Sequence, residues 1–411
     1  MNANAERRDV DLLGMKARKK VAAIVTEYRH WSHADVILGK LLEGYLHDGK
    51  EMPSLELVAL YTDQKPKNDL APALAKKHGF TLYSSIAETL CCGGKSLAVE
   101  GVLSIGEHGT YPKNARGQIL YPRRRFFEEI TQVFRASKKT VPVFNDKHLA
   151  ATWDDAKWMA EEAAKLFVPL MAGSSIPFTW RRPELKPAKQ TPFVAAVQLG
   201  YGPLEGYGFH ALEGMQCLLE RRVGGETGVK SVQAFTGKAM WDALDALPHA
   251  EALLQAALKL VPSHARSDLR TTTSKTADAA VFVLDYRDGL KAALAMLNGW
   301  LYEGDGGAFI FAGKIKDKPP VACHFYLQQP DPFAHFGQQL RAIEALIHTG
   351  HAPVPLERTL LTTGILEAAL ISLHEKGRKI DTPHLAIKYA SRDFPHLSGP
   401  IPKGIKRPRP E

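Results

Sequence analysis

The sequence contains few cysteines and no long apolar run. Its four cysteines, Cys91, Cys92, Cys217 and Cys323, show no CxxC spacing, and two of them are adjacent. This pattern favours a reducing compartment over a disulfide framework. No stretch approaches the ~20 apolar residues of a membrane span, and residues 1–20 hold no apolar core like that of a secretory signal. We therefore expect a cytoplasmic protein without a membrane partner.

Positively charged residues slightly outnumber negatively charged residues. The 411 residues include 53 Lys and Arg against 44 Asp and Glu, which gives a formal charge of +9. Part of the excess lies at the two ends, and we expect solvated basic tails over residues 1–19 and 396–411. Aromatic and basic residues are not interleaved on one element, as a nucleic-acid surface would require. We expect no nucleic-acid partner.

The first half of the chain alternates strand-like and helix-like segments. Residues 20–28, KVAAIVTEY, form a continuous apolar run like a buried parallel strand. Ser32, with Asp35 three residues later, is a helix-capping pattern, and a helical period follows. The alternation continues with short links, which predicts a Rossmann-like α/β domain, a doubly wound parallel sheet, over residues 20–176.

The second half of the chain has a different pattern of residues. Residues 177–192 are rich in proline, and later segments such as AAVFVLDY and GGAFIFAG alternate as in an antiparallel sheet. We expect an α+β domain with an open, mostly antiparallel sheet over residues 177–395, closed by two helices within 336–376. An open sheet would expose an apolar face, so we expect a homodimer or homotetramer formed through it.

In a doubly wound sheet, ligands bind at the carboxyl ends of the strands. That rule selects four groups of polar residues, each directly after an expected strand. They are Glu27-Tyr28, Asp63, Glu107-His108 and Asp146-Lys147-His148.

Three segments together resemble the Gfo/Idh/MocA-type oxidoreductases, the relatives of glucose–fructose oxidoreductase and inositol dehydrogenase. VPVFNDKHLAATWDDAKWMAEEAAKLFVPLMAG is similar to the stretch around the family's Glu-Lys-Pro motif. GPLEGYGFHALEGMQCLL is similar to its inter-domain segment with a catalytic histidine, and the two closing helices match in order. In this chain Asp146-Lys147-His148 stands at the motif, so the lysine matches while the acid and the proline are replaced.

The resemblance implies hydride transfer between NAD(P), with NAD preferred, and a hydroxyl or keto carbon of a sugar or cyclitol. It assigns Lys147 to the reacting oxygen and His210 to the proton, with Asp146 and His148 beside them. An ammonium can stabilise a developing alkoxide, and a neutral imidazole can accept the hydroxyl proton. Four residues before His210 the family has an aspartate, whereas this chain has Gly206, with Glu205 one position away.

The first turn departs from the family because it lacks glycine. TEYRHWSHAD contains none, although glycine there lets the backbone approach a pyrophosphate. Ser32 still begins a helix whose free N–H groups attract phosphate, and Asp63 is placed to bind the adenosine ribose. We expect the cofactor to contact Glu27, Tyr28, Arg29, His30, Ser32, Asp63, Gly106 and His108.

An insertion at residues 111–129 and the start of the second sheet supply candidates for substrate binding. Aromatic faces and guanidinium groups suit sugars and anions. The candidates are Tyr111, Arg116, Trp180, Arg181 and Tyr207.

A second interpretation starts from the many histidines expected at one rim. Three of His30, His33, His108 and His148 would suffice to hold a divalent metal with an open position. The same scaffold would then be a metal-assisted carbohydrate lyase or hydrolase, or a non-catalytic binding protein with weak or no dinucleotide binding.

Overall fold

The computed structural model describes residues 18–302, 306–329, 331–405 and 407. The expected basic tail at residues 1–19 therefore lies almost entirely outside the described residues, and Lys19 already opens the first strand. None of the helices in these ranges is long and apolar enough to cross a membrane.

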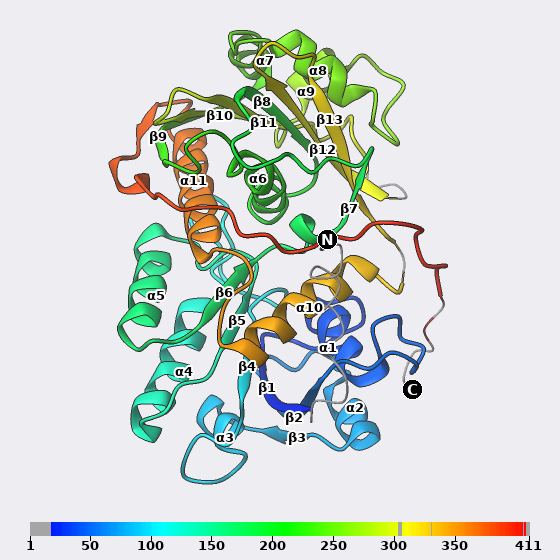
Figure 1. Cartoon of the computed structure of the whole chain (residues 1–411), viewed down its shortest axis with the longest axis vertical. Coiled ribbons are helices and arrows are strands. Elements are labelled where there is room, and N and C mark those ends of the chain that lie inside the picture. Colours follow the sequence, from blue (N-terminus) through cyan, green and yellow to red (C-terminus); the bar gives the residue numbers. More distant parts are fainter. Residues whose placement is uncertain (1–17, 303–305, 330, 406, 408–411) are drawn as a thin grey trace, which may run out of the picture.

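The first domain is built on a six-stranded parallel sheet with the order β3-β2-β1-β4-β5-β6, which confirms the predicted doubly wound fold (Figure 1). Alternate residues of β1 face opposite sides, as the pleat of a strand requires. Val21, Ala23 and Val25 pack with α1 and α2, whereas Ala22 and Ile24 pack with α3, α4 and α5. The elements are β1 (Lys19–Val25), α1 (His33–Glu43), β2 (Leu55–Thr62), α2 (Ala71–His78), β3 (Thr81–Tyr83), α3 (Ile86–Cys91), β4 (Gly101–Ile105), α4 (Arg123–Ser137), β5 (Val143–Asp146), α5 (Trp153–Lys165) and β6 (Leu170–Gly173).

The second domain contains an eight-stranded mixed sheet with the order β14-β9-β10-β11-β8-β12-β13-β7. Among the strand pairs of this sheet that the structure describes, only β11 and β8 are parallel, so the expected mostly antiparallel sheet is confirmed. Its elements are η1 (Ile176–Phe178), β7 (Trp180–Arg182), β8 (Phe193–Gly200), α6 (Gly206–Leu219), β9 (Val229–Thr236), α7 (Gly237–Asp245), α8 (Ala250–Leu258), α9 (Leu269–Lys275), β10 (Ala280–Tyr286), β11 (Lys291–Met296), β12 (Gly306–Ile315), β13 (Val321–Leu327), α11 (Leu356–His374), β14 (Ile380–Asp381) and η2 (Pro383–Leu385).

Helices cover both faces of this second sheet. α6 and α11 pack on one face, and α7 and α8 pack on the other, as Figure 1 shows above and below the strands. The apolar face that was expected to drive dimer or tetramer formation is therefore filled within the chain. The alternating pattern shows that one face needs a cover but not what covers it, and the homodimer or homotetramer stays a prediction.

The last helix before α11 belongs to the first domain. α10 (Ala334–Thr349) lies beside α1, and its Leu340, Ile343 and Leu346 share one core with β1 and β2. The expected boundaries placed this helix in the second domain, and the structure corrects that. Chain order does not determine which sheet an amphipathic helix covers, because its apolar stripe fits any complementary face.

The described part of the carboxyl-terminal segment is only partly solvated. The guanidinium of Arg407 contacts Asp35, at the start of α1, at 2.7 Å, and Asp331 at 2.7 Å. The Gln328 amide donates to the carbonyl of Pro402. The prediction of a free basic tail at 396–411 is wrong for Arg407, whose positive charge meets two buried carboxylates.

We expect Arg407→Ala to lower the free energy of unfolding by about 3 kcal/mol, because Asp35 and Asp331 would remain buried without their cation. Their side chains are only 4% exposed. Urea denaturation measures the change. Lys403→Ala, at an exposed position of the same segment, is the control. Equal stability of the two variants would show that the Arg407 pairs contribute nothing.

Candidate active site

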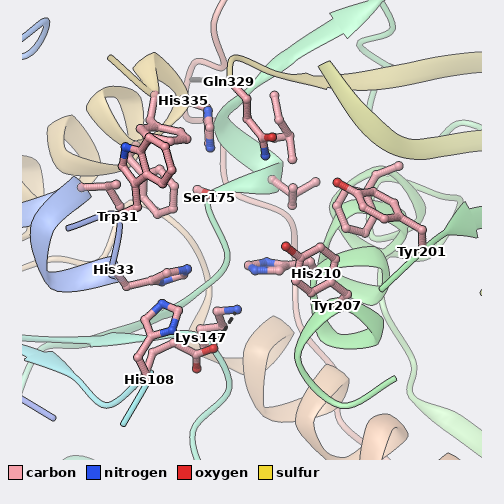
Figure 2. Close-up of a pocket in the computed structure, with 17 residues that line it drawn as sticks. Trp31, His33, His108, Lys147, Ser175, Tyr201, Tyr207, His210, Gln329 and His335 are labelled. Carbon is pink, nitrogen blue, oxygen red and sulfur yellow. Dashed lines mark ion pairs between the residues drawn. The ribbon is translucent and has the colours of Figure 1, made fainter. Parts of the chain in front are cut away.

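A cavity of about 700 Å³ lies between the two domains. It opens at the carboxyl ends of the parallel strands, where the sheet rule places ligands. Its walls come from the turn after β1, the ends of β4 and β5, the start of α6, the second sheet and α10. Figure 2 shows the main lining residues, namely Trp31, His33, His108, Lys147, Ser175, Tyr201, Tyr207, His210, Gln329 and His335.

Lys147 follows β5 directly and points into this cavity (Figure 2). Its φ of 64° lies in the left-handed region, which is uncommon for a residue with a side chain and is often found at functional sites. Its ammonium lies 3.2 Å from Glu107 and is 3% exposed. Burial would raise the pKa of Glu107, but Lys147 and Arg123 outweigh it and hold the pKa well below its ordinary value. The Glu107 carboxylate therefore stays ionised.

His210 enters the cavity from α6, on the side opposite the first domain. Its Nδ1 lies 2.5 Å from the Ser174 hydroxyl, which also accepts the Ile176 N–H at 3.0 Å. Burial, reinforced by the ammonium of Lys147, lowers the pKa of His210 well below its ordinary value. The imidazole is therefore neutral at physiological pH, with the Ser174 hydroxyl as the partner of its Nδ1.

His33 faces His210 across the cavity (Figure 2), with ring centroids 6.3 Å apart. Its Nδ1 lies 2.6 Å from a buried oxygen of Asp146. A carboxylate oxygen accepts hydrogen bonds, so Nδ1 of His33 donates at this contact and Nε2 is the ring nitrogen that does not face Asp146. Asp146, predicted as a catalytic residue, orients His33 and does not itself line the cavity. The sequence indicated His33 only as a metal ligand.

His148, also predicted as catalytic, points away from the cavity. Arg123 and Glu205 each contact its Nε2 at 2.8 Å, and it is 1% exposed. The residue one position from the expected aspartate, Glu205, thus binds His148 and not His210. The catalytic prediction for His148 is wrong, because the chain turns after Lys147 and buries the next side chain beneath α6.

The turn after β1 is closed by its own contacts. The Arg29 guanidinium lies 2.5 Å from Glu27 and 3.3 Å from Nδ1 of His108. The Ser32 hydroxyl caps α1 by accepting from the Asp35 N–H, as predicted. Tyr28 is fully buried in the core, and His30 stacks on Trp31. Tyr28 and His30 both line a smaller hollow beside α1 and α2, so their contact with a cofactor stays a prediction.

Two other residues that were predicted to bind the cofactor, Asp63 and Gly106, are in contact with other side chains of the protein. Asp63 accepts from Tyr61 and Arg125 on one oxygen and from Tyr111 on the other. A Cβ on Gly106 would lie 2.7 Å from Cγ of Arg123, so this glycine makes room for Arg123. His108, in contrast, lines the cavity. The residues around β1 and β2 do not fit a dinucleotide held in the usual pose.

Of the expected substrate residues, only Tyr207 lines the cavity. Tyr111 is bound to Asp63, and Arg116 forms an ion pair with Glu367 at 3.1 Å. Trp180 is buried in β7, and Arg181 lines a separate small hollow. These four predictions are wrong, because residue type and position along the chain do not give the direction of a side chain.

The histidines also do not assemble as the metal hypothesis expected. His30 and His148 lie outside the cavity, whereas His33 and His108 line it with centroids 5.4 Å apart. Among the described residues, no group of three His, Cys, Asp or Glu side chains is arranged to hold a metal ion. No sequence pattern indicated a ligand role for the lining residues His335, Gln329 and Tyr201, which come from segments far along the chain.

The neutral histidines make the fold sensitive to acid. Burial lowers the pKa of His108 and of His335 to about 3, whereas the unfolded chain takes up these protons near pH 6.5. The folded pKa is depressed, so stability is lost as pH falls below about 6.5, by about 2 kcal/mol per histidine at pH 5. Urea unfolding at pH 7.5 and pH 5 measures the loss.

His335→Gln should reduce this loss, whereas His351→Gln, at an exposed position, should leave it unchanged. A stability that is flat between pH 7.5 and pH 5 would contradict the assignment of neutral buried imidazoles.

Comparisons with family models and with curated proteins give no match. Solved structures do match. GenD2 from gentamicin A biosynthesis, in complex with NAD, is 14% identical with a TM-score of 0.54, over 89% of this chain and 97% of that one. A probable dehydrogenase from Thermotoga maritima is 15% identical with a TM-score of 0.55, over 89% and 99%. Scyllo-inositol dehydrogenase from Lactobacillus casei is 10% identical with a TM-score of 0.55, over 89% and 99%.

At these identities, the comparisons establish the fold and not the reaction. They show that the chain shares the two-domain fold of these solved structures, which include a probable dehydrogenase and an inositol dehydrogenase.

Proposed function

We propose that the inter-domain cavity is the active site of an enzyme that moves a proton at a hydroxyl-bearing or carbonyl carbon of a small sugar-like molecule. One observation carries the proposal. Lys147 and His210 come from different domains, yet both line the same cavity, with Lys147 close enough to His210 to lower its pKa. Tyr201, Tyr207 and Phe309 add aromatic faces, which suit a sugar ring.

The residues have distinct parts in this chemistry. The Lys147 ammonium, paired with Glu107 at 3.2 Å, donates a hydrogen bond to the substrate oxygen and stabilises negative charge that develops there. The neutral imidazole of His210 takes the proton, or returns it in the reverse direction. Ser174 holds the ring through Nδ1.

One form of this chemistry is the oxidoreductase reaction that the sequence resemblance implies, with NAD or NADP accepting the hydride. It is supported by the similar structures, which include dehydrogenases and complexes with NAD. The contacts of Glu27 and Asp63 do not support it, because both carboxylates already have partners within the chain, Arg29 for the first and Arg125 for the second.

The second form is redox-neutral, and the facing imidazoles favour it. With a carbonyl oxygen at Lys147, one imidazole removes a proton from the adjacent carbon. The other returns a proton to the opposite face, and electrons and atoms balance without a cofactor. The 6.3 Å between the ring centroids of His33 and His210, and the partners that hold their Nδ1 atoms, favour one base on each side.

Proton exchange tests the proposal directly. The full chain is incubated in D₂O with myo-inositol, scyllo-inositol and 2-keto-myo-inositol, with and without NAD⁺ or NADP⁺, and followed by NMR. We expect conversion or deuterium uptake, and His210→Asn should slow it by about 10²- to 10⁴-fold. Phe167→Ala, at an exposed surface position, is the control. Equal rates for His210→Asn and the wild type, or no reaction across the panel, would contradict the proposal.

A further inference from the structure

A dinucleotide on a doubly wound sheet crosses the end of the first strand, between the ends of its two neighbours. In this sheet β1 lies between β2 and β4. The segments after β2 and β4 therefore border the place where adenosine and pyrophosphate would lie.

Here these two segments are bonded to each other over the end of β1. The Gln64 amide donates to the Thr110 carbonyl at 2.8 Å and accepts the Thr110 N–H at 2.9 Å. The Tyr111 hydroxyl donates to Asp63 at 2.7 Å. Because Asp63 and Gln64 follow β2 while Thr110 and Tyr111 follow β4, the contacts span β1. We call these four residues the bridge.

The acid that would receive the adenosine ribose is already engaged. One oxygen of Asp63 accepts from Tyr61 at 2.8 Å and from Arg125 at 2.5 Å, and the other accepts from Tyr111. Ribose hydroxyls would have to displace these donors, including a cation, and the exchange would lose a charge-assisted hydrogen bond.

The phosphate position is closed in the same way. The Thr26 hydroxyl donates to the Glu107 carbonyl at 2.5 Å, and Arg29 joins Glu27 to His108. Glu27 is 6% exposed. A pyrophosphate would meet this carboxylate in a turn that has no glycine to admit it, and like charges repel.

We infer that the chain closes the adenosine diphosphate site with its own residues, so that the inter-domain cavity receives a compact ligand and no dinucleotide spans the sheet. The inference rests on the proposed function in that it selects the redox-neutral form of the same active site. It concerns a part of the surface that the reaction at Lys147 and His210 does not touch.

ADP-ribose is the decisive probe, because it carries the adenosine diphosphate half and lacks nicotinamide. Isothermal titration of the full chain with ADP-ribose should give no saturable heat at about 1 mM, a concentration at which even a contribution of −4 kcal/mol is detectable. NADH should bind no more tightly than reduced nicotinamide mononucleotide. A cooperative thermal transition confirms that the sample is folded.

Saturable binding of ADP-ribose, or NADH binding at least tenfold tighter than the mononucleotide, overturns the inference. If ADP-ribose binds, its affinity for the double variant Gln64→Ala/Tyr111→Phe shows whether it binds at the bridge. Loss of the bridge contacts would change the affinity of a ligand bound there. The exchange experiment in D₂O without nucleotide is judged separately. Failure of that reaction contradicts the proposed function but not the closure of the adenosine diphosphate site. Binding of ADP-ribose contradicts the closure of that site but not the proposed function.

Discussion

Lys147→Met is expected to lower turnover in the cavity by about 10³-fold, because it removes the cation that stabilises charge on the substrate oxygen. It has a second effect through His210. Burial and the Lys147 ammonium together lower the pKa of His210. Without the ammonium that pKa rises, so a larger fraction of His210 is protonated at low pH and cannot act as the base. The acidic limb of the pH–rate profile should therefore move to higher pH.

The exchange rate of each variant, measured as a function of pH, separates the two effects. Lys147→Arg keeps the positive charge and should keep the acidic limb in place, although its planar group contacts oxygen in a different geometry. Lys238→Met, at an exposed position that pairs only with Asp242 in the described structure, is the unrelated control. An unchanged acidic limb in Lys147→Met would show that Lys147 does not set the pKa of His210.

Arg358→Met is expected to lower the free energy of unfolding by about 4 kcal/mol, because it leaves Glu220 charged and buried. Arg358 on α11 donates to both oxygens of Glu220 at the end of α6, at 2.8 and 2.6 Å. The two side chains are 6% and 2% exposed. This pair fixes α11 against α6, the helix that carries His210.

Urea denaturation gives the change, and two variants interpret it. Lys238→Met breaks an ion pair of similar length whose side chains are 84% and 62% exposed, and it should cost less than about 1 kcal/mol. Arg358→Met/Glu220→Leu removes both charges and should recover much of the loss, since the penalty comes from the unpaired carboxylate. A double variant as unstable as Arg358→Met would indicate lost packing and not lost pairing.

The part of the site on the first domain could be predicted because it follows from strand direction. Parallel strands end at one edge, so Glu107 after β4 and Lys147 after β5 had to lie close together, and they form an ion pair. His210 was found differently. Its segment resembles a known family, and no local pattern would have distinguished it from a packed histidine.

The sequence did not reveal the contacts that fix the orientation of each side chain. His33 and Asp146 are 113 positions apart, and the contact that orients the imidazole depends on the fold. Arg181 and Arg116 looked suited to a ligand, but each has a partner that no pattern indicates, the Leu185 carbonyl and Glu367. The absence of glycine from the first turn was visible in the sequence and indicated an unusual phosphate site. The bridge between the segments after β2 and β4 is the structural counterpart of that absence.

The return of α10 to the first domain has a consequence for dissecting this protein. Leu340, Ile343 and Leu346 complete a core that they share with residues from the start of the chain, including Val21 and Leu55. A fragment that stops where the parallel sheet ends would leave that hydrophobic face bare and prone to aggregate. The segments that form the two domains therefore alternate along the sequence. We expect neither domain to fold when it is expressed by itself as a continuous fragment.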